Sequence, residues 1–209
     1  PLSYAISIVD KLDSLVGFFL IDEKPTSSKD PFALRRAAIG LLRTIIENNL
    51  TIRLKEIINY SLRLYIEQGV VVENQNTERD LLVFFKERMR NILKEKKIKA
   101  DIIEASLSAH TGDGYLDLFK KSTIMNSNFD KETGRDALYS YKRVSNILEY
   151  ELKKSKKELT GRPDAILFRK EEEKLLYEKI NEIRKLFTVK EDSKNYENLL
   201  NHLAHVKET

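Results

Sequence analysis

The stretch Lys29-Asp30-Pro31-Phe32-Ala33-Leu34-Arg35-Arg36-Ala37-Ala38 predicts the start of a helix and, with it, the kind of fold. Asp30 is a good N-cap, and Pro31 suits the first helical position, where the missing N–H needs no intrahelical acceptor. We therefore expect a helix that begins here and runs to about Asn48. Its apolar residues recur at three- and four-residue spacing and form one buried face: Leu34, Ala38, Leu41, Leu42, Ile45 and Ile46.

Basic residues occupy another face of this predicted helix. Arg36 and Arg43 lie seven residues apart, with Gly40 between them. Glycine is a weak helix former, so we expect it to let another backbone, or a ligand, come close. The simplest interpretation of this face is a solvated basic surface. Arg35 and Arg36 either contact RNA or pair with acidic residues that hold the first two helices together, and we expect at least one of them to have this structural role.

Composition favours an all-α, soluble chain. The 209 residues are 41% hydrophobic and 33% charged, enough for one large domain or two small ones. Seven glycines and four prolines are few, so turns must be sparse and the elements long. The absence of cysteine excludes disulfides and thiolate metal sites and fits a reducing cytoplasm. No apolar run is long enough to span a bilayer, and the start at Pro1 suggests a fragment of a longer protein.

The net charge of +4 is only a weak indication of a nucleic-acid partner. Basic residues outnumber acidic ones between Arg79 and Lys99, and Lys153, Lys154, Lys156 and Lys157 form a second basic cluster. Both clusters can meet phosphates, or can simply keep helix ends solvated.

Three amphipathic helices are predicted in residues 1–72. The first spans about residues 2–20, the second begins at Asp30, and the third ends near Gly69. The first helix has a wide apolar face made of Ala5, Ile8, Val9, Leu12, Leu15, Val16 and Phe19. Because residues 73–76 are polar, we place a domain boundary after residue 72 and a second helical domain in residues 73–209.

The second domain is expected to open with a helix at Thr77. Thr77 and Asp80 resemble a capping box. Further along, Lys86, Arg90 and Lys94 form a like-charged row that destabilises the helix unless an anion or a tertiary acid meets it. A short helix over residues 101–107 and a turn at residues 110–114 follow.

Residues 136–148 predict a helix with two distinct faces. Leu138, Tyr141, Ser145, Leu148 and Leu152 fall on one face, which we expect to be buried. The opposite face carries four side chains suited to RNA, since arginine and lysine bind phosphate, asparagine pairs with base edges and tyrosine stacks. These four are Tyr139, Lys142, Arg143 and Asn146. A solvated face is the alternative interpretation.

Two more helices are predicted towards the C-terminus. One has glutamates 171–173 in its first turn, Arg184 and Lys185 in its last turn and a buried stripe, an arrangement that suits the helix macrodipole. The stripe consists of Leu176, Ile180, Ile183 and Phe187. A final helix carries Tyr196, Leu199, Leu200, Leu203 and Val206.

Three stretches resemble the β subunit of bacterial two-subunit glycyl-tRNA synthetase. Residues 29–38 look like its signature, and residues 141–148 are similar to a Lys-Arg-Val-x-Asn-Ile-Leu pattern in its anticodon-binding region. Residues 9–13 resemble the last aspartate-bearing helix of HD-type phosphohydrolases, a region that this β subunit also carries. Asp10 matches the metal-binding aspartate, but the only histidines, His110, His202 and His205, do not lie upstream of it. We therefore expect Asp10 to have a structural or vestigial role and no metal to bind.

The resemblance implies a helical bundle followed by a helical anticodon-binding-like domain. Residues 1–72 would be the end of the HD-like region, and residues 73–209 an arginyl-type anticodon-binding domain truncated at its C-terminus. The family attaches glycine to tRNA(Gly) with ATP and Mg²⁺, using an α subunit for the adenylate chemistry in a tetramer of two α and two β subunits. This chain is therefore expected to bind tRNA in the cytoplasm and to hold neither catalytic residues nor a cofactor.

The candidate tRNA-binding residues are Arg35, Arg36, Tyr139, Lys142, Arg143 and Asn146. Two other functions remain open at this point. A fragment of an HD-type phosphohydrolase would need histidines that the chain lacks upstream of Asp10, and a non-catalytic helical adaptor would bind no RNA.

Overall fold

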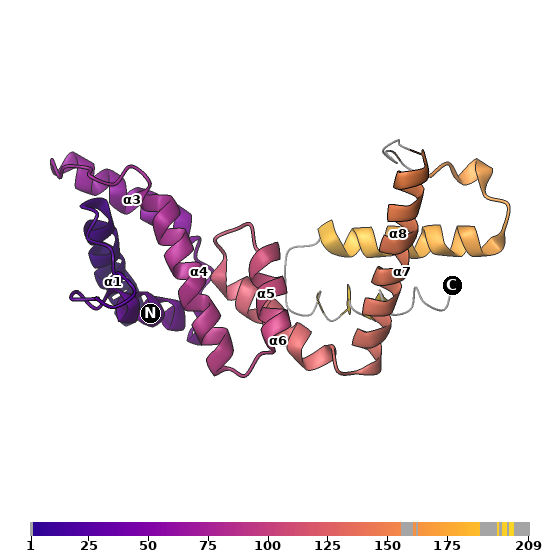
Figure 1. The fold of residues 1–209 in the computed structure, drawn as a ribbon, viewed down its shortest axis with the longest axis horizontal. Helices are drawn as coiled ribbons and strands as arrows, with labels where there is room; N and C mark the ends of the chain where they lie inside the picture. Colours follow the sequence, from indigo (N-terminus) through magenta and orange to yellow (C-terminus); the bar gives the residue numbers. More distant parts are fainter. Residues whose placement is uncertain are drawn as a thin grey trace. The chain divides into compact units, whose positions relative to one another are not determined.

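The computed structural model describes residues 2–155, 161, 163–188, 196, 198–199 and 201–202. These residues form helices and no strand, which confirms the all-α prediction for the described part of the chain (Figure 1). In chain order the elements are α1 (Leu2–Leu20), α2 (Leu34–Glu47), α3 (Leu54–Glu67), α4 (Thr77–Glu95), α5 (Ala100–Ala109), α6 (Tyr115–Asn128), α7 (Glu132–Ser155), the 3₁₀ turn η1 (Ala165–Leu167) and α8 (Glu171–Thr188). None of the described helices has both the length and the apolar character of a membrane span.

The chain divides into two compact units, residues 1–122 and residues 123–209. In unit 1, α4 packs against α1, α2 and α3, so this unit continues across the boundary predicted at residue 72. The assignment of residues 1–72 to an HD-like region and of residues 73–209 to an anticodon-binding-like domain stays a prediction.

The core of unit 1 lies where α2 packs against α1 and α4. The apolar face predicted for α2 is confirmed except at Ile46, which is half-buried. On α1 the buried residues begin at Ile8, while Ala5 and Val9 are exposed, so the predicted apolar face of α1 was too wide. The fully buried side chains include Leu15, Phe19, Leu20, Leu41, Leu42, Ile45, Leu54, Ile58, Leu81, Phe85 and Met89.

A buried asparagine joins the end of α1 to the start of α4. The amide nitrogen of Asn74 donates to the Phe19 carbonyl (3.2 Å) and to Asp80 Oδ2 (3.1 Å). Its amide oxygen accepts from the backbone N–H of Asn76 (2.9 Å), and Thr77 Oγ1 donates to the Asn74 carbonyl (2.7 Å). Because buried polar groups are stabilising only when paired, this network fixes the chain between the two helices.

The capping box predicted at Thr77 is wrong. Asn76 is the N-cap residue, and Thr77 is the first residue of α4, with its hydroxyl directed to carbonyls outside the helix. Asp80 pairs with Lys24 Nζ (2.8 Å) rather than with the backbone N–H that a capping box requires. This hydrogen bond from Lys24 holds the pKa of Asp80 below its ordinary value, so the pair stabilises the fold at neutral pH and is lost as the pH falls through that lowered pKa.

The turn predicted at residues 110–114 is confirmed, and it caps a distant helix. Asp113 accepts from the backbone N–H of Leu54 through its carbonyl (3.5 Å) and from that of Lys55 through Oδ2 (2.8 Å). Next to it, the buried Tyr115 donates its hydroxyl to the Leu82 carbonyl (3.0 Å). The start of α3 is therefore completed by residues much later in the chain.

The stripe predicted to be buried on α7 is exposed in the described structure. Leu138 and Leu152 are 38% and 37% exposed, and Tyr141 is 69% exposed. The buried positions of α7 are instead the small residues Gly134, Ala137 and Ser140. A Cβ on Gly134 would lie 2.2 Å from the Asn128 carbonyl oxygen, so α7 starts in very close contact with the end of α6.

The helix predicted near residues 171–187 is confirmed as α8. Its stripe is buried at Ile183, whereas Leu176 and Ile180 are partly exposed, and the side chain of Phe187 lies outside the described residues. In the final predicted helix, residues 196, 198, 199, 201 and 202 are helical, and Leu200, Leu203 and Val206 lie outside the described part.

Candidate nucleic-acid interface

Asp30 caps α2, but not as its first residue. The helix begins at Leu34, and Ala33, with a left-handed φ of 56°, is the N-cap residue. Asp30 Oδ1 accepts from the Leu34 N–H (2.8 Å) and Oδ2 from the Arg35 N–H (3.1 Å). The predicted start at Asp30 was therefore too early, because residues 30–33 form a turn that holds the carboxylate over the free N–H groups.

The two neighbouring arginines of α2 have different surroundings. Arg35 is partly buried; Nη2 donates to the Thr26 carbonyl, and Nη1 lies 3.9 Å from Asp30 Oδ2. Arg36 is exposed and has no hydrogen bond or ion pair within the described residues. Arg35 thus ties the preceding loop to α2, while Arg36 remains available to a ligand.

We expect single alanine variants to separate these roles. Arg35→Ala loses the bond to the loop and should destabilise unit 1 by about 1 kcal/mol. Arg36→Ala should leave thermal unfolding unchanged and weaken RNA binding. Circular dichroism melts and filter binding measure the two effects, and unchanged stability and affinity in both variants would contradict both roles.

Arg36 lines an open groove of about 360 Å³ between α1 and α2. Phe32 also lines this groove, and the residue is 45% exposed. Its ring stacks on the ring of Phe18, with the two centroids 3.9 Å apart. Lys11 lies on the α1 side, and a Cβ on Gly40 would be 3.0 Å from Lys11 Cε. Among the described residues, the group that comes close to Gly40 is therefore the Lys11 side chain, and not another backbone as predicted. The full lining is Asp10, Lys11, Ser14, Phe32, Ala33, Arg36 and Ala37.

Asp10, the position matched to an HD-type metal ligand, lies exposed in this groove. The other charged residues in the lining are the cations Lys11 and Arg36, whose positive charge disfavours a metal ion in the groove. Within the described residues, no three His, Cys, Asp or Glu side chains are grouped to hold a metal ion. His205, one of the histidines considered above, lies outside those residues.

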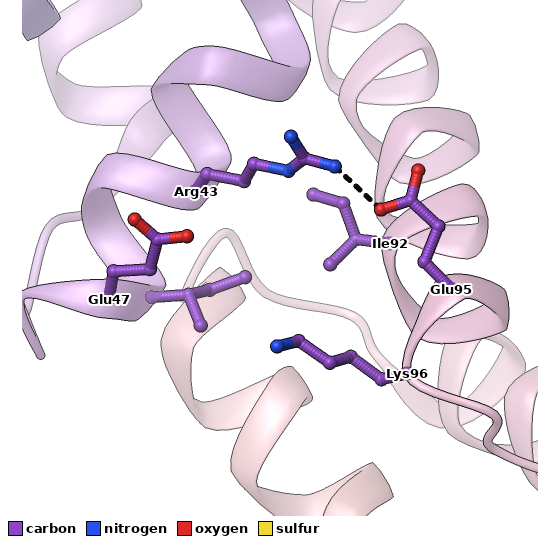
Figure 2. Close-up of a pocket in the computed structure, with 6 residues that line it drawn as sticks. Arg43, Glu47, Ile92, Glu95 and Lys96 are labelled. Atoms are coloured by element: carbon purple, nitrogen blue, oxygen red, sulfur yellow. Dashed lines mark hydrogen bonds and ion pairs between the residues drawn. The ribbon is translucent and has the colours of Figure 1, made fainter.

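Arg43, predicted to share a basic face with Arg36, is already paired. Its Nη2 lies 2.6 Å from Glu95 Oε2 across a groove of about 240 Å³ between α2 and α4 (Figure 2). Glu47 and Lys96 lie on the same rim, so acids and bases alternate around it. An anion gains little attraction there.

Arg90, the middle residue of the row of cations predicted on α4, is paired with acids. Arg90 donates through Nε and Nη2 to the two carboxylate oxygens of Glu104 on α5 (both 2.9 Å) and also pairs with Glu87. These bonds raise the pKa of Arg90 above its ordinary value. This is the tertiary acid that the like-charged row requires, so Arg90 is a link between α4 and α5.

Arg88 is a basic residue that the sequence interpretation missed. Its guanidinium lies over the Phe84 ring (4.5 Å from Cζ to the centroid), and its buried Nε has no hydrogen-bond partner in the described part of the chain. Burial, and then the charge of Arg35, lower the pKa of Arg88. The four-residue spacing from Phe84 is the signal that could have identified this stacked arginine.

The face predicted on α7 is exposed as expected. Tyr139, Lys142, Arg143 and Asn146 are all exposed and follow one another at helical spacing along α7. Lys142, Arg143 and Asn146 make no hydrogen bond or ion pair with any described residue. These four residues lie in unit 2, whereas Arg35 and Arg36 lie in unit 1.

Comparisons with known proteins agree with one another. A family model described as glycyl-tRNA synthetase beta subunit matches residues 1–108. Proteins named glycine–tRNA ligase beta subunit are similar to this chain: the one from Rhodospirillum centenum is 40% identical over 157 residues, 74% of this chain and 21% of its own length. One from Cereibacter sphaeroides is 38% identical over 148 residues (71% and 21%), and one from Ruegeria sp. is 34% identical over 177 residues (80% and 24%). The chain thus spans about a fifth to a quarter of the length of these relatives.

Proposed function

Because this chain belongs to the family of glycyl-tRNA synthetase β subunits, we propose that it is a tRNA-binding part of a two-subunit glycine–tRNA ligase. In this proposal the whole enzyme attaches glycine to tRNA(Gly) with ATP and Mg²⁺ in the cytoplasm. The α subunit performs the adenylate chemistry, two α and two β subunits assemble, and the residues described above contribute recognition.

The observation that carries the proposal is the exposed face of α7. On one side of a helix, this face offers a tyrosine ring for stacking, a lysine and an arginine for binding phosphate, and an asparagine for hydrogen bonds to a base edge. Three of its four side chains have no partner among the described residues, so they keep their hydrogen-bonding capacity for a ligand. We assign this face to the anticodon arm.

The α7 variants should separate phosphate contacts from base contacts. Lys142→Ala should weaken binding of all tRNAs alike and reduce the salt dependence of log K by about one ion. If Arg143 or Asn146 contacts a base edge, its alanine variant should lose about 1–3 kcal/mol for tRNA with the glycine anticodon only. Filter binding of cognate and anticodon-swapped tRNA to the full-length protein measures both effects.

Lys174→Ala is a matched control, because Lys174 lies in the same unit but is already paired with Glu171 (3.1 Å). It should bind both tRNAs like the unmodified protein. All four variants should keep the unfolding temperature of the unmodified protein, since these side chains are exposed. Normal binding by the α7 variants would remove this face from the anticodon site, and no tRNA binding at low salt would favour a helical adaptor.

A further inference from the structure

We propose that the groove between α1 and α2 binds one unpaired nucleotide of an RNA, with the base on Phe32 and a phosphate on Arg36. The inference rests on the proposed RNA-binding function and assigns a second contact site, in unit 1, with its own chemistry. The residues that carry it are Phe32, Arg36, Lys11 and Asp10.

Phe32 has the properties of a stacking platform. Its ring lies nearly parallel to that of Phe18, with an interplanar angle of 18°, so the ring is held from one side. Phe32 nevertheless remains 45% exposed, so part of its surface is open to a ligand. A fixed ring with accessible surface is what an unstacked base requires, because every base has an aromatic face.

Two cations stand beside this ring. Among the described residues, Arg36 is exposed and unpaired, and Lys11 donates only to Ser7 in its own helix (2.8 Å to Oγ, 3.3 Å to the carbonyl). Gly40 leaves room for the Lys11 stem, since a Cβ there would approach it to 3.0 Å. Lys11 lines the groove together with Arg36, and the guanidinium of Arg36 can bind two phosphate oxygens in a planar fork.

Asp10 provides an acceptor in a groove that is otherwise basic. A carboxylate accepts hydrogen bonds from the exocyclic amino group of a base, and it repels a phosphate that lies directly against it. Asp10 therefore favours a ligand that has both an amino group and a phosphate. A nucleotide has both groups, whereas a simple anion has no amino group. The groove volume of about 360 Å³ lies within the range of small-ligand sites, about 300–1,000 Å³.

The binding surface must be reached by an unpaired base, because a base inside a duplex has its faces covered by its neighbours. The expected ligand is thus a single-stranded segment or an extruded base, and not the side of a helical stem. A stacked base contributes strongly to such binding, so both the ring and the base should be needed at once.

A double-substitution cycle between the protein and the RNA tests this inference. The protein is the full-length chain, unmodified or as Phe32→Leu, and the RNA is a single strand of about ten nucleotides, within the usual site sizes. Abasic sites are placed at each position in turn, and affinity is measured by fluorescence anisotropy. We expect one or more abasic positions to weaken the unmodified protein roughly tenfold and to have almost no further effect in Phe32→Leu.

Three further variants make the test specific. Phe32→Tyr should restore the dependence on the base, because tyrosine stacks as phenylalanine does. Arg36→Ala should weaken every RNA alike and reduce the salt dependence of log K by about one ion. Arg63→Ala removes an equal charge from an exposed position of α3 that does not line the groove, and it should change neither property.

The outcomes distinguish this inference from the proposed function. If every abasic site weakens Phe32→Leu as much as the unmodified protein, while tRNA still binds with anticodon preference, the groove assignment is wrong and the proposed function stands. Absence of all RNA binding at low salt overturns both. Saturable binding of adenosine monophosphate to the groove, without coupling between Phe32 and any RNA base, would also overturn the assignment, because the ligand would then be a free nucleotide.

Discussion

Replacing Gly134 with alanine should destabilise the contact between α6 and α7 by about 3 kcal/mol. At an ordinary helical position the same change would be stabilising by about 1 kcal/mol, because alanine has the higher helix propensity. Here the added Cβ would lie 2.2 Å from the Asn128 carbonyl oxygen and 2.7 Å from Phe129 Cα. Both atoms are backbone, so no side chain can rotate away and the two helices must separate.

Hydrogen exchange measured on peptides from α6 and α7 provides the readout, and thermal unfolding supplies the overall stability. Gly112→Ala is the control, since its Cβ would meet only ordinary contacts, the nearest being His110 Cε1 at 3.9 Å. That variant should stay within about 0.5 kcal/mol of the unmodified protein. Faster exchange in Gly134→Ala is expected in unit 2, and equal or slower exchange there would contradict the close helix contact.

Asn74→Leu should destabilise unit 1 by about 3 kcal/mol, although leucine is close to asparagine in size. The substitution removes the bonds to the Phe19 carbonyl, to Asp80 and from the Asn76 N–H. Asn74 is buried, so water cannot replace these partners without opening the structure. The loss should exceed what any single exposed hydrogen bond of unit 1 contributes.

Gln75→Leu is the matched control for this prediction. Gln75 is the next residue and is exposed. Its replacement by leucine also removes a side-chain amide, but one that is not buried. Urea unfolding of the full-length protein, followed by hydrogen exchange at α1 and α4, measures the difference between the two variants. Equal midpoints for Asn74→Leu and Gln75→Leu would show that the buried network contributes nothing.

Local patterns predicted the helices well because those patterns act within a few residues. The spacing of apolar residues in α2 and α3 and the glutamates at the start of α8 all correspond to helices of the described structure. Hydrogen bonds between residues far apart in the sequence could not be predicted from local patterns. Asp80 follows Thr77 at the spacing of a capping box, yet Lys24 and Asn74 take its carboxylate.

The site was predicted less completely than the fold. The exposure of Tyr139, Lys142, Arg143 and Asn146 followed from helical spacing, but the same spacing led to a buried stripe that is in fact exposed. The reason is that α7 buries a face of small residues, Gly134, Ala137 and Ser140. Periodicity alone does not predict that a face of small residues is buried in preference to a face of large apolar residues. Arg88 and Phe32 become notable only through Phe84 and Phe18, which pack against them.

The cap that Asp113 places on α3 has a consequence for the order of folding during synthesis. The backbone N–H of Lys55 donates to Asp113, which lies 58 positions later in the chain. The ribosome must therefore translate past residue 113 before the first turn of α3 can be capped. A 14-residue helix is marginal by itself, since isolated helices below about 12–15 residues are barely stable in water. During synthesis the start of α3 is therefore only partly helical. Unit 1 completes its fold when residues 110–114 have left the ribosome and have bound the first turn of α3.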